Sequence, residues 1–427
     1  MNKLEDFSIP RMEKHTFPNG MNFYFKKTDA EGLLRLDIIL PAGIQYQSRP
    51  LLASMTNSLL KEGSRRLTSA QIAERFDYYG AFINYGCGLE NACINLYSPK
   101  KYFGQTLELL NELLRYPLFP QKELDISLER NRQSHLISLQ KVQVLAGLEI
   151  QKCLLGPEHP YAQKLQEDDF GSFDASLLAE FHNIHYCADR STALLSGELS
   201  PEDCKLLEQT LGTEPWRASS CIAPREAPIV PLKPQKIVVP KSDSLQAALR
   251  FAIYLNIDKQ HDDFKKLRFV DTILGGYFGS RLMSKLREEK AYTYGISSMI
   301  NVYKEMSYMD IRCQTDVKYA DALVQGVYDE IKKLQDQEVS EREMDLVRNY
   351  LNGDFARLMD GPFSLSELYM HSCSLGLDVG FYEKQMEIFQ QINAREVMEL
   401  AQRYLVPEEF YEVRAGGNIQ AAETLIQ

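Results

Sequence analysis

The chain has 427 residues, of which 44% are hydrophobic and 25% charged, and its formal net charge is −11. This composition excludes a disordered or collagen-like chain, and the acidic balance argues against a nucleic-acid partner, which needs clustered lysine and arginine. No stretch approaches the ~18 apolar residues of a membrane span. With no apolar run of signal-peptide length near Met1, we expect a cytoplasmic protein without a membrane partner.

The first half alternates short strands with helices. Ala92 and Ile94 fall on one face of a half-buried strand, and Leu107, Leu110 and Leu114 recur at helical spacing. These patterns predict strands near 33–40, 81–87 and 90–97, and helices near 50–62, 69–79, 101–115 and 121–152.

A proline-rich segment, 216–237, contains four prolines and no helical period, so we expect a linker there between domains 1–215 and 238–427. Beyond the linker the same order of elements returns. We expect strands near 245–255, 293–300 and 306–314, and helices near 261–274, 279–288, 316–336 and 340–375.

The two halves keep a common register. The alternating strand at 92–96 returns at 309–313, an offset of 217, and Leu59-Leu60 returns as Ile273-Leu274, an offset of 214. One structural plan used twice explains this register. Adjacent short strands indicate an antiparallel or mixed sheet, and blocks of helices indicate packing on one face. The sequence therefore predicts an α+β fold of two homologous αβ domains.

The segment GGYFGSRLMSKLREEKAYTYGISS, residues 275–298, carries the strongest chemical signal. Gly275 and Gly276 follow an apolar helix end, where the backbone can turn tightly or be approached closely. Arg287 lies near a helix end, and Tyr294, seven residues later, opens a strand. A guanidinium and a phenol that converge on one cleft can hold a carbonyl oxygen or a developing oxyanion. The alternative is a surface arginine and a strand tyrosine that never meet.

This segment resembles the C-terminal-domain signature of the pitrilysin/insulinase family of inverted-motif zinc peptidases, which includes the mitochondrial processing peptidases. The matching runs are Gly275-Gly276, Ser280-Arg281-Leu282, Leu286-Arg287 and Tyr294, together with FPNG (17–20), EGS (62–64) and HPY (159–161). The resemblance implies two homologous αβ domains, with two such pairs closing around a peptide chamber. It also implies that Arg287 and Tyr294 reach the substrate and the tetrahedral intermediate, and we expect Gly275 and Gly276 to contact the substrate.

The zinc motif is where the sequence departs from the family. Active members carry H-x-x-E-H, in which two histidines bind zinc and the glutamate is the general base. The corresponding slots hold Ser54, Asn57 and Ser58, and the slot of the downstream glutamate ligand holds Arg130. A slip of one residue would put Glu129 there, which leaves a glutamate without histidines. We therefore expect no family-type zinc site in this chain, and a zinc ion in a partner subunit instead.

Two histidines, His182 and His185, lie three residues apart, with Glu180 close by. This group could hold a metal ion. The alternative is a pair of helix-end histidines that are partly buried or cap carbonyl groups.

The resemblance implies three possible functions. The first is the zinc-less subunit of a heterodimeric endopeptidase or oligopeptidase, in which Arg287 and Tyr294 act on a peptide or small protein at the partner's zinc. The second is a catalytically inactive scaffold or peptide-binding protein, for which a homodimer is possible. The third is unrelated chemistry on the same fold, since fold does not fix function.

Overall fold

The computed structural model describes residues 7–171, 173–216 and 228–417, so most of the predicted linker, 217–227, lies outside the described residues. The first half forms a six-stranded mixed sheet in the order β1-β2-β6-β3-β5-β4. Only the β2–β6 pairing is parallel among these strands. The strands are β1 (Glu13–Thr16), β2 (Asn22–Lys27), β3 (Leu33–Leu40), β4 (Phe82–Cys87), β5 (Ala92–Pro99) and β6 (Thr192–Gly197).

The second half forms a five-stranded mixed sheet in the order β7-β11-β8-β10-β9, in which β7 and β11 are parallel. The strands are β7 (Lys236–Val239), β8 (Gln246–Tyr254), β9 (Thr293–Val302), β10 (Ser307–Asp316) and β11 (Tyr411–Ala415). The predicted fold class, α+β with mixed sheets, is confirmed. The exact domain boundaries stay a prediction.

Each sheet packs one face against helices of its own half. In the first half these are α1 (Leu52–Ser58), α2 (Ser69–Tyr78), α3 (Phe103–Arg115), α6 (Ala175–His185) and α7 (Pro201–Leu207). In the second half they are α8 (Asp262–Asp271), α9 (Ala320–Asp336), α10 (Glu341–Leu358), α12 (Gly380–Gln391) and α13 (Ala394–Tyr404), with π-helical segments Thr272–Gly276 and Met283–Glu289. The π-helical segments lie against β9.

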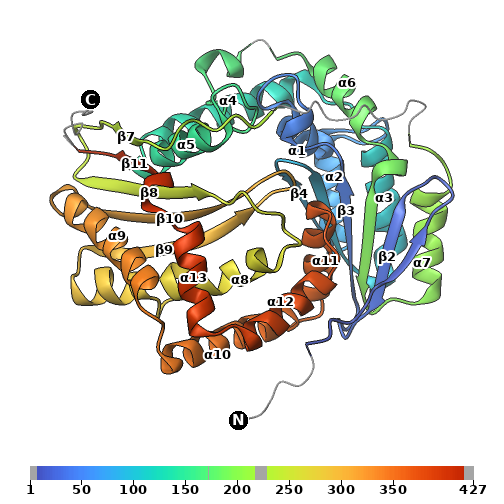
Figure 1. Cartoon of the computed structure of the whole chain (residues 1–427). Coiled ribbons are helices and arrows are strands. Elements are labelled where there is room, and N and C mark those ends of the chain that lie inside the picture. The colour runs from blue at the N-terminus through green and yellow to red at the C-terminus, as the bar shows by residue number, and fades with distance from the viewer. Residues whose placement is uncertain (1–6, 172, 217–227, 418–427) are drawn as a thin grey trace.

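The other face of each sheet is covered by a helix from the opposite half, as Figure 1 shows. Helix α5 (Val142–Leu155) packs through buried Ala146 and Ile150 on β8 and β11 of the second sheet. Helix α11 (Ser364–Leu375) packs through Leu368 on β3 and β6 of the first sheet. Its Glu367 also accepts a hydrogen bond of 2.7 Å from buried Arg35. This exchange creates two hydrophobic clusters that contain residues of both halves.

Two sequence predictions were wrong about helix length. The expected helix at 121–152 is two helices, α4 (Gln121–Leu139) and α5, because Lys141 between them has an extended backbone. The expected helix at 340–375 is likewise α10 and α11. Gly361 there has a positive φ of 110°, and the following Pro362 cannot continue a helix. Both breaks redirect the chain toward the opposite sheet. Among the described helices, none is long and apolar enough to cross a membrane.

Candidate functional site

Arg287 and Tyr294 line one surface hollow of about 510 Å³ in the second half. Asp316, the last residue of β10, and Tyr319 of the 3-10 turn that follows also line it. The side-chain Nε of Arg287 donates a hydrogen bond of 2.9 Å to the backbone oxygen of Tyr294. The two residues are therefore in contact, while the predicted convergence of guanidinium and phenol stays a prediction. The contact runs through the tyrosine backbone, which leaves its phenol free of Arg287.

The local sequence explains this geometry. Met283 and Leu286 are buried and hold the π-helical segment against the core. Ala291 then adopts a positive φ of 52°, which turns the chain sharply from the helix into β9. The Thr293 hydroxyl donates a hydrogen bond of 2.6 Å to the backbone oxygen of Gln314, which fixes the start of β9 on β10. Tyr294 is thus placed by buried neighbours on both sides.

The Tyr294 side chain faces outward, with 94% of it exposed. Phe278, which does not line the hollow and was not singled out from the sequence, is 63% exposed. The Arg287 guanidinium carbon lies 4.6 Å from the centre of the Phe278 ring, a cation–π contact that orients the guanidinium. Phe278 belongs to the run GGYFGS. An aromatic residue between glycines was the available signal for it, but sequence does not reveal exposure.

Gly275 and Gly276 end the π-helical segment Thr272–Gly276 and do not line the hollow. A Cβ atom added to Gly275 would come within 2.7–2.9 Å of Ser298 on β9, including its backbone nitrogen. Glycine is required there because the π-helical turn approaches the strand so closely. The structure supplies a packing reason for Gly275, and the predicted contact with substrate remains a prediction.

The slots of the zinc motif lie on α1 and are used for packing. Ser54 and Ser58 donate hydrogen bonds to the carbonyl oxygens of Leu51 (3.0 Å) and Met55 (3.3 Å) in the same helical region. The Asn57 side chain is 1% exposed and bridges the helix to the sheet. Its amide nitrogen donates to the backbone oxygens of Gly86 (2.6 Å) and Cys93 (3.3 Å), and its amide oxygen accepts from the Tyr186 hydroxyl (3.0 Å). These residues do not fit a zinc ion.

The downstream slot on α4 is also unsuited to a metal. Arg130 is exposed. Its neighbour Glu129 accepts hydrogen bonds from Arg132 (2.8 Å) and Gln133 (2.9 Å), and these bonds lower the pKa of the Glu129 carboxyl to about 2. In the part of the chain that the structure describes, no group of three or more histidine, cysteine, aspartate or glutamate residues is placed to hold a metal ion.

His182 and His185 are buried at the end of α6 among aromatic rings. The His182 ring lies 4.5 Å from that of Tyr186, and the His185 ring lies 4.4 Å from that of Phe181. Burial lowers the pKa of His185 to about 4, so its imidazole is neutral at pH 7. This environment is that of core histidines.

Comparisons with known proteins agree with this fold. Residues 172–351 match the family model described as Peptidase M16 inactive domain. The "non-peptidase homolog YmxG" of Helicobacter pylori is 23% identical over 81% of this chain and 80% of its own length. The crystal structure of a peptidase M16 inactive domain from Pseudomonas fluorescens has a TM-score of 0.87 and 24% identity, and the match covers 96% of this chain and 98% of that one. The periplasmic protease PqqL of Escherichia coli has a TM-score of 0.79 and 13% identity over 96% of this chain, but only 46% of its own.

Proposed function

We propose that this chain is a relative of the pitrilysin/insulinase-type (M16) peptidases in which the zinc-motif positions hold other residues, and that it is the zinc-less subunit of a two-chain peptidase. In this role the chain is inactive alone. It contributes Arg287 and Tyr294 to a homologous partner subunit that carries the zinc ion, and the substrate is a peptide or small protein.

The observation that carries this proposal is the outward-facing Arg287–Tyr294 pair. A large aromatic side chain that is 94% exposed contributes little to the stability of its own chain. Tyr294 instead presents its hydroxyl where an external group can accept or donate a hydrogen bond. Arg287 uses Nε to bind the Tyr294 backbone, so the orientation of its guanidinium is fixed before any ligand arrives. Such pre-organisation is what stabilisation of a developing oxyanion requires.

The chemistry of peptide hydrolysis divides naturally between two chains. One requirement is an activated water, which a zinc ion and a glutamate provide. This chain's own slot holds Asn57, an amide that cannot take up a proton as a base. The second requirement is a set of donors for the substrate carbonyl as negative charge develops on its oxygen. Arg287 and Tyr294 are donors of that kind.

The length comparison supports a second subunit. This chain covers 46% of the protease PqqL, so that chain has room for another unit of similar size. The present chain, with 427 residues, forms two sheets joined by exchanged helices. A separate partner chain would supply what the longer protein carries in one polypeptide.

The test is to mix the purified chain with a homologous chain that carries H-x-x-E-H and to measure peptide cleavage. We expect the mixture to cleave the peptide faster than either chain alone. In the mixture, Arg287→Ala and Tyr294→Phe should each lower kcat by about 10- to 10³-fold, the range for loss of an oxyanion donor.

A matched control is Tyr78→Phe, which changes an equally solvent-facing tyrosine, 78% exposed, on α2. It should leave kcat unchanged. An unchanged kcat in the mixtures with Arg287→Ala and with Tyr294→Phe would contradict a catalytic role for these two residues.

A second candidate is a non-catalytic scaffold or peptide-binding protein, possible also as a homodimer. The relative named as a non-peptidase homologue favours it. In that case the complex should form and survive both substitutions, while no partner should give peptidase activity.

A further inference from the structure

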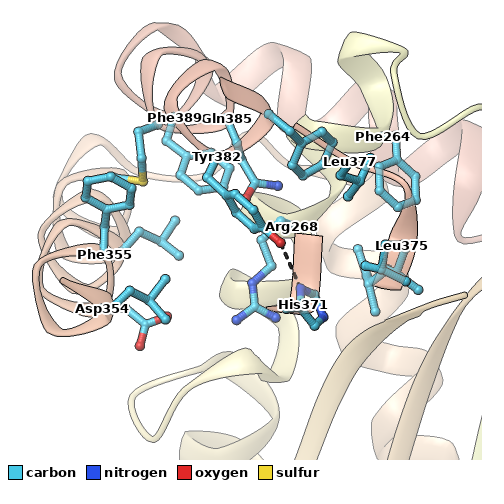
Figure 2. Close-up of a pocket in the computed structure, with 16 residues that line it drawn as sticks. Phe264, Arg268, Asp354, Phe355, His371, Leu375, Leu377, Tyr382, Gln385 and Phe389 are labelled. Atoms are coloured by element: carbon cyan, nitrogen blue, oxygen red, sulfur yellow. Dashed lines mark hydrogen bonds between the residues drawn. The ribbon is translucent and has the colours of Figure 1, made fainter. Parts of the chain in front are cut away.

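A separate pocket of about 310 Å³ lies in the second half, between α8, α10, α11 and α12 and the end of β9. Its size is near the lower end of the ~300–1,000 Å³ range of small-molecule sites. Apolar side chains make up most of its wall, including Phe264, Phe355 and Phe389. Figure 2 shows these rings around the rim of the pocket, with Arg268 near its centre.

Arg268 is the charged side chain that would select the ligand of this pocket. Its side chain is 34% exposed, and its Nη1 lies 3.5 Å from Oδ2 of Asp271, one helical turn further along. Asp271 is fully buried, and both of its carboxylate oxygens lack a hydrogen bond from any described residue. The guanidinium therefore balances the charge of Asp271 without spending its hydrogen-bond donors on it. Those N–H groups remain available to an acceptor inside the pocket.

The other polar groups of the wall are already occupied or neutral. His371 Nδ1 and the Tyr382 hydroxyl share a hydrogen bond of 2.8 Å, visible as the dashed line in Figure 2. Burial lowers the pKa of His371, which keeps its imidazole neutral at pH 7. Asp354, which also lines the pocket, has its charge paired with the exposed Arg357 one turn further along α10. Arg268 is thus the cation that a ligand inside the pocket would meet.

We propose that this pocket binds an apolar carboxylate, with the hydrocarbon or aromatic body among the phenylalanine and leucine side chains and the carboxylate on Arg268. A planar guanidinium binds a carboxylate through two parallel hydrogen bonds. The chain already uses this bidentate arrangement elsewhere, between Arg281 and Glu343 at 2.8 and 2.9 Å. A guanidinium shared by two carboxylates also occurs, because Arg35 donates one hydrogen bond to buried Asp37 (2.9 Å) and another to Glu367 (2.7 Å). Arg268 likewise lies beside one buried carboxylate, that of Asp271. A bound ligand would supply the second carboxylate.

The ligand can be a free apolar acid or the carboxyl terminus of a peptide that ends in an apolar residue. Both present the same chemistry to Arg268. The inference does not depend on the proposed peptidase role, because the pocket shares none of its lining residues with the Arg287–Tyr294 hollow.

The experiment is isothermal titration of the full chain with sodium 4-phenylbutyrate and with its uncharged analogue 4-phenylbutyramide. The acid should bind about 10- to 100-fold more tightly than the amide, the range for a hydrogen bond to a charged group. Equal affinity for the two compounds, or binding of neither, would overturn the proposal.

Variants locate the site. Asp271→Asn should retain binding of the acid, whereas Arg268→Met in the Asp271→Asn background should weaken it by at least about 10-fold without leaving a buried charge unpaired. Leu377→Trp, which fills the pocket from the loop after α11, should also weaken binding and serves if the double variant does not fold. Arg342→Met, an exposed position on α10, is the charge-matched control. Unchanged affinity in both pocket variants would contradict the assignment.

A pair of peptides that end in phenylalanine distinguishes the two sources of carboxylate. Displacement of 4-phenylbutyrate by the peptide with a free carboxyl terminus, and not by its amidated form, would identify a peptide end as the ligand. If neither peptide displaces the bound acid, the ligand is a free apolar acid.

Discussion

Asn57 and Asp271 are separated by 214 residues, the offset that also relates Leu59-Leu60 to Ile273-Leu274. Each lies near the end of a helix, α1 or α8, that packs in its own half. Both side chains are fully buried. Asn57 forms three hydrogen bonds, which tie α1 to β4, to β5 and to the residue after α6. The Asp271 carboxylate has no hydrogen bond from a described residue, and Arg268 balances its charge at 3.5 Å.

The two halves therefore differ in what their polar groups contact near this position. In the first half, the buried Asn57 side chain is used as a packing contact. In the second half, polar groups remain directed outward: Arg268 faces a pocket, and Arg287 and Tyr294 face a hollow.

The largest loss of stability is expected from a substitution of Asn57. Asn57→Ala should lower the free energy of unfolding by about 2–4 kcal/mol, because a buried polar group left without its partner costs about 1–3 kcal/mol. Here the Tyr186 hydroxyl and two carbonyl oxygens lose their partner. Urea unfolding measures the change. Ser58→Ala, which removes a bond within one helix, is the control, and equal losses in both variants would contradict the role of Asn57.

A substitution of Asp271, in the second half, should change the free energy of unfolding in the opposite direction. Burial raises the pKa of Asp271 to about 6 from its usual 3.8. The folded state then holds the proton more tightly than the unfolded state, so this group reduces stability as pH rises from about 4 to about 6. A shift of about two pKa units corresponds to about 3 kcal/mol. Asp271→Asn should therefore stabilise the protein by about 2–3 kcal/mol at pH 7, and the gain should vanish near pH 4.

Urea unfolding of the wild type and of Asp271→Asn at both pH values tests this sign. A variant that is less stable than the wild type at pH 7 would show that the Arg268–Asp271 pair is a net source of stability.

Gly275 tests whether the outward-facing site depends on the packing beneath it. Gly275→Ala places a methyl group against Ser298, including its backbone nitrogen at 2.8 Å. Such overpacking should cost about 1–3 kcal/mol, and it should displace the π-helical segments from β9. Gly353, whose added Cβ would meet nothing within 4 Å, gives the matched control Gly353→Ala. Equal stability of Gly275→Ala and the wild type would show that the turn can shift without cost.

The smallest effect is expected at Tyr294. Because its side chain is exposed, Tyr294→Phe should change stability by less than about 0.5 kcal/mol. Tyr186→Phe, which leaves the amide oxygen of Asn57 without its partner, should cost about 1–3 kcal/mol. Thermal unfolding of the two variants sharpens the contrast between a contact residue and a packing residue. A comparable loss in Tyr294→Phe would mean that its hydroxyl serves the fold.

The sequence was sufficient for much of the repeated order of strands and helices, because periodicity reports which face of an element is buried. It left open whether Arg287 and Tyr294 meet, and only the family resemblance favoured it. The same information cannot tell which sheet a helix will cover. Helices α5 and α11 were therefore predicted as continuations of α4 and α10, although each crosses to the opposite half.

The pocket around Arg268 was also beyond sequence reasoning. Its phenylalanine and leucine residues recur at helical spacing and are indistinguishable from a filled core in the sequence. Strands β6 and β11 were missed for a related reason. Both are almost wholly buried, and a short apolar run of this kind shows no alternation.

The central claim is that this chain works with a zinc-bearing partner, and native mass spectrometry of the protein isolated from its own cells, with a metal assay on the same sample, tests it most directly. We expect a one-to-one complex with a chain of similar size that contains H-x-x-E-H, and one zinc ion per complex. A zinc-free homodimer, or zinc bound to this chain alone, would contradict the account.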